Sequence, residues 1–124
     1  MRSEQVMYFT KKEEEFTALL IDLGMHRNVA KVLVYLAGAG EATSRTIDRG
    51  IDLREPEVSL AISQLAERGW VSSREIRGEN RGRPVKIYQL ALPVTEIISN
   101  IEHEKRIEVT NTLNLIKKFR ESVA

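Results

Sequence analysis

The sequence predicts a mainly helical domain with a small β-hairpin, followed by one long helix. Three observations support this fold class. Apolar residues recur at helical spacing over most of the first 70 residues, β-branched and aromatic residues gather between residues 70 and 91, and neither glycine nor proline occurs after Pro93. With 124 residues and 14.1 kDa, the chain has the length of one compact domain with an added element.

The first two predicted helices cover residues 11–23 and 27–37. Thr10 and Glu13 have the spacing of a capping box, in which each residue's side chain bonds the backbone of the other. The apolar residues of the first helix are Phe16, Leu19, Leu20 and Leu23, and those of the second are Val29, Ala30, Leu33, Val34 and Ala37. Gly24 and the run 38–40 are expected to end the two helices.

Two shorter helices joined by a tight turn follow. Thr43 and Ser44 can cap a helix around residues 45–49, and Gly50 is expected to supply the turn. Pro56 suits the start of a fourth helix, over residues 55–68. The side chains of this helix expected to face the core are Val58, Ile62, Leu65 and Ala66.

The sequence changes character at Trp70, which is expected to pack beside the core. Residues 70–77 and 85–91 read as two strands, and the segment 78–84 between them is rich in turn formers. Pro93 then opens a helix to Ala124 with an apolar stripe that is interrupted by the charged residues 102–108. Three segments are therefore expected: a tail and helix over 1–24, a central domain over 25–92, and a long helix over 93–124.

Net positive charge is concentrated in the hairpin. The chain as a whole has 19 basic and 18 acidic residues and a formal charge of +1, so it is not a polycation. Residues 71–92 nevertheless hold five basic residues against two acidic ones, whereas residues 41–70 hold four against six. The basic side chains of the hairpin are Arg74, Arg77, Arg81, Arg83 and Lys86. A projecting basic hairpin can approach a polyanion such as DNA without burying charge.

The hairpin tip carries Arg81, Gly82, Arg83 and Pro84 in succession. Glycine lets the backbone lie close to a surface, and arginines beside it suit a narrow A·T-rich minor groove with strong negative potential. The same four residues form the core of the AT-hook. The tip is therefore predicted to contact DNA.

The order of elements, with a helix-turn-helix followed by a hairpin, is that of the winged-helix DNA-binding fold. Residues 20–92 resemble archaeal winged-helix regulators of the TrmB, MarR and ArsR-like type. The resemblance is carried by residues 23–25 and 30–32, Val58, Ser59, Leu65, the segments 69–71 and 82–84, Tyr88 and Leu90. It implies that helix 55–68 enters the major groove, that helix 43–50 supports it, that the wing 71–91 touches the flanking backbone or minor groove, and that the protein is a homodimer. His26 stands where this family often has a capping serine or threonine.

Helical periodicity predicts which side of helix 55–68 is free for DNA. The available residues are Pro56, Glu57, Ser59, Leu60, Ser63 and Gln64. Ser59, Ser63 and Gln64 suit base or phosphate contacts, and Gln64 can pair bidentately with adenine. At the supporting helix, Thr43, Ser44 and Arg45 are candidates for phosphate contacts, with helix capping as the alternative for the two hydroxyls. Glu55 and Glu57 depart from the pattern, because phosphates repel carboxylates.

The final helix is predicted to hold two copies together. About thirty helical residues extend roughly 45 Å, which is too long for one small domain to cover. Pairing with a second copy and with the apolar face of helix 11–23 would cover the stripe. The alternative is a helix that breaks within residues 102–108 and folds back on its own core. The residues expected at the dimer interface are Phe16, Leu19, Leu20, Ile97, Ile98, Ile101, Val109, Leu113, Ile116 and Phe119.

Other chemistry finds little support in the sequence. There is no cysteine, and His26 and His103 are the two histidines, so neither a metal nor another cofactor is predicted. No catalytic motif is present, and an enzyme is not expected. The longest apolar stretch, residues 32–40, is too short to span a membrane, and a cytoplasmic protein without a signal peptide is expected.

The sequence thus predicts a homodimeric transcriptional regulator that binds double-stranded DNA. Two alternatives stay open: a protein-interaction module of the transcription machinery, and an architectural protein that coats A·T-rich DNA. The operator, the direction of regulation and any small-molecule effector are not specified by the sequence.

Overall fold

The computed structural model describes residues 9–77 and 82–124. The chain divides into two compact units, residues 1–92 and 93–124. The first unit contains four helices, α1 to α4, and three short strands, β1 to β3, within its described residues, and the second is the helix α5.

Helix α1 (Lys11–Asp22) begins with the predicted capping box, which the structure confirms. The hydroxyl of Thr10 accepts the N–H of Glu13 at 3.2 Å, and the N–H of Thr10 donates to the Glu13 carboxylate at 2.8 Å. Thr17 is the buried residue of this helix, and its hydroxyl donates to the carbonyl of Glu13 at 2.9 Å. The inward face is therefore centred on Thr17, which leaves Phe16 and Leu19 exposed.

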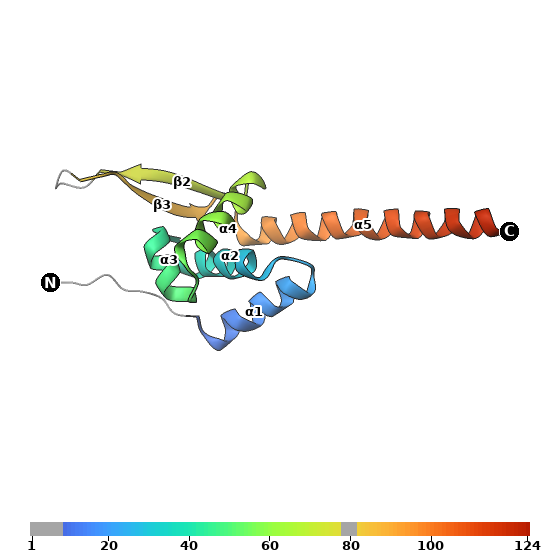
Figure 1. The fold of residues 1–124 in the computed structure, drawn as a ribbon, viewed down its shortest axis with the longest axis horizontal. Helices are drawn as coiled ribbons and strands as arrows, with labels where there is room; N and C mark the ends of the chain where they lie inside the picture. Colours follow the sequence, from blue (N-terminus) through green and yellow to red (C-terminus); the bar gives the residue numbers. More distant parts are fainter. Residues whose placement is uncertain (1–8, 78–81) are drawn as a thin grey trace. The chain divides into compact units, whose positions relative to one another are not determined.

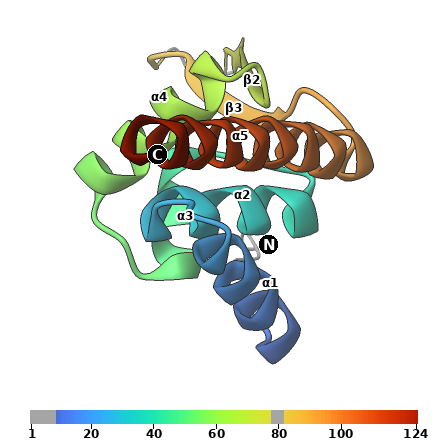
Figure 2. The same ribbon diagram turned by 90° about the vertical axis from the view of Figure 1, so that its right-hand side faces the viewer.

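Helix α2 (Arg27–Ala39) lies between α1 and α4 and forms the centre of the unit (Figure 1; Figure 2). It buries every residue from Val32 to Leu36, as well as Val29 and Ala30, whereas Ala37 is exposed. The helix ends at Ala39 rather than at residue 37, where Gly40 at the C-cap has a positive φ of 86° that favours glycine. At its start the Nδ1 atom of His26 accepts the N–H of Asn28 at 3.2 Å, so His26 is the N-cap.

Helices α3 (Ser44–Ile51) and α4 (Glu55–Glu67) form the predicted helix-turn-helix. The prediction that Gly50 supplies the turn is wrong, because Gly50 is a buried residue inside α3. Asp52 makes the turn instead, with a left-handed φ of 55°.

The inward face of α4 also differs from the prediction at one position. The buried residues are Val58, Ala61, Ile62 and Leu65, whereas Ala66 is exposed. Ala61 lies three residues after Val58 and four before Leu65, on one helical stripe, and Ala66 is turned about 100° away from Leu65. Ala61 therefore takes the core position that the sequence had assigned to Ala66.

The strands β2 (Val71–Ile76) and β3 (Val85–Leu90) pair antiparallel and form the predicted hairpin (Figure 1). A third strand that was not predicted, β1 (Glu41–Ala42), pairs with β3 and gives the sheet order β1-β3-β2. Two residues are too few to show the alternation that marks a strand in a sequence.

The base of the hairpin is anchored in the core. Val71 and Ala42 are buried, and Trp70 is only 1% exposed, with the Arg68 guanidinium 4.0 Å from the centre of its ring. The predicted packing role of Trp70 is confirmed. The first unit therefore has the winged helix-turn-helix architecture, in which β2 and β3 form the wing.

The second unit is one helix, α5 (Val94–Val123), of 30 residues. The alternative of a break within residues 102–108 is wrong, since the helix runs through this stretch. Its charges pair along the helix surface: Lys105 with Glu108 at 2.9 Å, and Arg106 with Glu102 at 2.6 Å. Among the described residues, no helix is long and apolar enough to cross a membrane.

Candidate nucleic-acid interface

The outer face of α4 is exposed and carries small polar side chains. Ser59, Ser63 and Gln64 are all exposed, and Leu60 beside them is 61% exposed. No described residue hydrogen bonds to the side chains of Ser59, Ser63 or Gln64. Because Val58 and its buried neighbours hold the opposite face against the core, these side chains are free to meet a ligand.

Glu57, one of the predicted DNA contacts on α4, forms a capping hydrogen bond at the start of that helix. Its carboxylate accepts the backbone N–H of Arg54, the N-cap residue, at 2.8 Å. This bond satisfies an amide that would otherwise lack a partner, and the negative charge suits the positive end of the helix dipole. Glu57 therefore stabilises the helix start, and Pro56 beside it occupies the first turn.

Thr43 at the start of α3 also acts as a cap. Its hydroxyl accepts the N–H of Thr46 at 3.1 Å and lies 3.0 Å from the hydroxyl of Thr46. Ser44 is half-buried and Arg45 is exposed. The hydrogen bond to Thr46 supports the capping role of Thr43, whereas the side chain of Arg45 is exposed to solvent.

Two further basic residues were missed in the sequence. Arg49 is exposed and lies four residues after Arg45, so both guanidinium groups are on one face of α3. Arg54 is exposed at the start of α4. Arg49 and Arg54 were overlooked because residues 41–70 contain more acidic than basic residues. The i,i+4 spacing of Arg45 and Arg49 was nevertheless a usable signal.

The basic side chains of the wing differ in their surroundings. Arg74 crosses the sheet: one guanidinium nitrogen donates to the side-chain oxygen of Gln89 on β3, and the other donates to the Glu41 carboxylate on β1 at 2.9 Å. These contacts tie the three strands together on the solvent side. The Glu41 carboxylate also neutralises the charge of Arg74 locally.

The remaining basic groups of the wing are more open. Arg77, Arg83 and Lys86 are exposed, and no described residue pairs with the guanidinium groups of Arg77 or Arg83. Gly82 is described and exposed, whereas Arg81 lies outside the described residues. The available positive charge of the wing is therefore at its far end rather than at Arg74.

Exposed apolar side chains are found on α1 in the first unit and along α5 in the second. In the first unit, α1 exposes Phe16 (46%) and Leu19 (60%), and Leu20 is half-buried. In α5, Ile97 is buried and Ile101 is half-buried. The other predicted interface residues of α5 are exposed: Ile98, Val109, Leu113, Ile116 and Phe119. Four apolar residues that were not predicted are exposed as well: Val94, Ile107, Leu115 and Val123.

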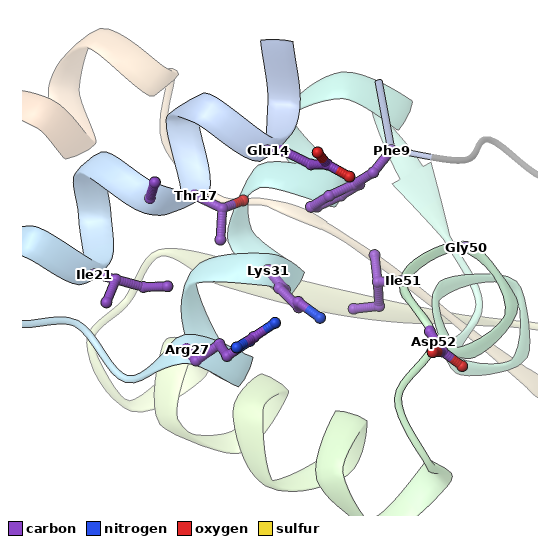
Figure 3. Close-up of a pocket in the computed structure, with 10 residues that line it drawn as sticks. Phe9, Glu14, Thr17, Ile21, Arg27, Lys31, Gly50, Ile51 and Asp52 are labelled. Atoms are coloured by element: carbon purple, nitrogen blue, oxygen red, sulfur yellow. The ribbon is translucent and has the colours of Figure 1, made fainter. Parts of the chain in front are cut away.

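A pocket of about 560 Å³ lies between α1, the start of α2 and the end of α3 (Figure 3). Arg27 and Lys31 reach into it from α2, and Glu14 and Asp52 from the elements on either side. Two positive and two negative groups give it no net charge. No described residue of α4 or of the wing lines it, so it is separate from the exposed face of α4.

These features define a winged-helix protein in which the outer face of α4 is polar and the wing is basic. No protein-family model matches the chain. Among solved structures, the archaeal chromatin protein TrmBL2 matches with a TM-score of 0.66 and 15% identity over 90% of this chain, and this chain spans 40% of the length of that one. A possible transcriptional regulator from Methanosarcina mazei matches with a TM-score of 0.59 and 15% identity, over 90% of this chain and 97% of that one.

A bacterial regulator gives the same result. NMB1585, a MarR family regulator from Neisseria meningitidis, matches with a TM-score of 0.50 and 19% identity, over 89% of this chain and 86% of that one. At these identities the similarity establishes the fold. The chain has the winged-helix fold of TrmB-like and MarR-type regulators, as the sequence predicted.

Proposed function

We propose that this protein is a DNA-binding transcriptional regulator of the cytoplasm that acts as a homodimer. Helix α4 enters the major groove, α3 supports it, and the wing lies along the flanking backbone or minor groove. The observation that carries the proposal is the outer face of α4, where Ser59, Ser63 and Gln64 are exposed on a helix anchored through its other face. The regulators with the same fold support it.

The distribution of charge supports the same arrangement. Arg45 and Arg49 on α3, and Arg77 and Arg83 on the wing, offer exposed positive groups for phosphates, while α4 itself offers short polar side chains for base edges. Phosphate contacts then supply affinity, and the polar groups of α4 supply selectivity. Ser44, Gly82 and Lys86 belong to the same proposed surface.

The homodimer is proposed from the apolar stripe of α5. Ile98, Val109, Ile116 and Phe119 are exposed along a helix of 30 residues, which is about 45 Å long. A second copy of α5 and the exposed face of α1 would cover these side chains. Two α4 helices would then meet half-sites about 34 Å apart on one duplex.

Footprinting on the DNA upstream of the protein's own coding region tests the DNA-binding proposal. We expect two protected half-sites about one helical turn apart, with protection lost in the variant carrying both Ser63→Ala and Gln64→Ala. Ser122→Ala at the far end of α5 is the matched control and should protect the same sites. Uniform protection of all DNA present, or none at all, would contradict site-specific regulation.

Light scattering at micromolar concentration tests the dimer. We expect twice the mass of the chain for the natural protein and a single chain for the double variant Ile116→Glu and Phe119→Glu. Ile107→Glu, which lies on the other side of α5, should leave the dimer intact. A monomeric natural protein would exclude the dimer.

A second candidate function is that of an architectural DNA-binding protein. It is favoured by the similarity to TrmBL2, an archaeal chromatin protein whose structure shows a novel mode of DNA binding. Uniform protection in the footprint, combined with a strong dependence of affinity on salt, would support it.

A further inference from the structure

Leu60 is an apolar side chain in a polar setting. The larger apolar side chains elsewhere in α4 face the core, with Val58 and Leu65 at 0% exposure and Ile62 at 7%, whereas Leu60 is 61% exposed. Isolated exposed leucines are common on protein surfaces. Leu60 is distinguished by its position: it lies on the outer face of α4 with Ser59, Ser63 and Gln64 around it.

The spacing of Leu60 and Gln64 places them together. Residues four apart lie on the same side of a helix, one turn apart, which is about 6 Å along the axis. Base pairs in a duplex are about 3.4 Å apart. A helix lying in the major groove would therefore bring the two side chains to base pairs one or two steps apart.

The chemistry of these side chains favours A·T pairs. In the major groove, an adenine offers the acceptor and donor pair that a glutamine amide matches, and thymine offers a methyl group for an apolar contact. Guanine is most often read by arginine or lysine, and α4 has neither between Glu55 and Glu67. The exposed face of α4 is thus suited to adenine and to the methyl group of thymine.

We propose that Leu60 is a specificity-determining residue that contacts the 5-methyl group of thymine, and that with Gln64 it selects A·T pairs one or two steps apart. This rests on the proposed function. Leu60 packs its side chain against the methyl group and excludes water from it, while Gln64 donates to and accepts from the adenine edge. A cytosine at that position lacks the methyl group and leaves the leucine facing a polar amino group.

The experiment compares two versions of the protected upstream duplex, one natural and one in which deoxyuridine replaces every thymidine. Fluorescence anisotropy gives the affinity of the natural protein and of Leu60→Ala for both. Deoxyuridine pairs as thymidine does and lacks only the methyl group. We expect the natural protein to lose about four-fold in affinity for each methyl group contacted, and Leu60→Ala to bind both duplexes equally.

Two further variants make the comparison specific. Leu60→Met keeps an apolar side chain and should keep the preference for thymine. Ser59→Ala, the control on the same turn of α4, should keep the full preference whatever its affinity. Unfolding midpoints of all variants should agree, because Leu60 is exposed and alanine and methionine are good helix formers.

The outcomes distinguish this proposal from the proposed DNA-binding function on which it rests. Binding of the natural protein to its site without a preference for thymine would overturn the role of Leu60 and leave the regulator intact. A preference that survives in Leu60→Ala would do the same. Absence of any DNA binding would overturn both proposals, and Leu60 would then be assigned to a protein contact.

Discussion

Three of the four arginines of the wing, Arg74, Arg77 and Arg83, should differ in their contribution to DNA binding. Arg77 and Arg83 are exposed without a partner among the described residues, whereas Arg74 is bound to the Glu41 carboxylate at 2.9 Å and to Gln89. A guanidinium that is free can neutralise a phosphate and release a counterion from the DNA. One that is already paired with a carboxylate releases few counterions.

The expected magnitude follows from counting free guanidinium groups. Each phosphate neutralised contributes about 0.9 to the slope of log affinity against log salt. The double variant Arg77→Ala and Arg83→Ala should therefore lower this slope by about 1.8. Between 50 and 200 mM salt, that difference narrows the affinity gap between the variant and the natural protein by about twelve-fold.

Fluorescence anisotropy across this salt range measures the slope. Arg74→Ala is the matched control and should leave the slope almost unchanged, with a small loss of stability because an exposed ion pair contributes only about 0–1 kcal/mol. A fall in slope for Arg74→Ala equal to that for Arg83→Ala would refute the assignment of roles within the wing. An unchanged slope in the double variant would remove the wing from the DNA interface.

Three changes test the fold. Leu65→Ala should lower the free energy of unfolding by about 2–5 kcal/mol in denaturant melts, because Leu65 is fully buried. Leu60→Ala on the same helix should change the free energy of unfolding by less than about 0.5 kcal/mol, because Leu60 is exposed. Equal losses in the two variants would contradict the orientation of α4. Asp52→Gly should raise the thermal midpoint, and Asp52→Ala should lower it, since the left-handed φ of 55° costs alanine about 1 kcal/mol. A higher midpoint for Asp52→Ala would contradict the left-handed conformation at residue 52. His26→Ala should cost about 0.5–2 kcal/mol through loss of the α2 cap, and His26→Ser should retain the stability; equal melts would show that the cap contributes nothing.

Helix starts and buried periodic faces could be predicted closely. Thr10 and Glu13 identified the start of α1 because both partners of a capping box are local in sequence. The hairpin followed from the β-branched residues of its strands and the turn formers between them. These signals depend on neighbouring residues, and they are therefore visible in one sequence.

Features that depend on distant residues could not be predicted. The strand β1 exists because Glu41 and Ala42 meet β3 after the chain has folded, and two residues carry no periodicity. The pairing of Arg74 with Glu41 spans 33 residues, and it links β2 to β1 through a side chain that the sequence offers for DNA. Gly50 looked like a turn residue, but it is buried inside α3, and Asp52 makes the turn.

The most direct test of the central claim compares the affinity of this protein for its own upstream DNA with its affinity for a scrambled duplex of equal composition, by fluorescence anisotropy near physiological salt. A site-specific regulator should bind the upstream DNA about a thousand-fold or more tightly than the scrambled duplex. Equal affinities for the two duplexes, or no binding to either, would contradict it.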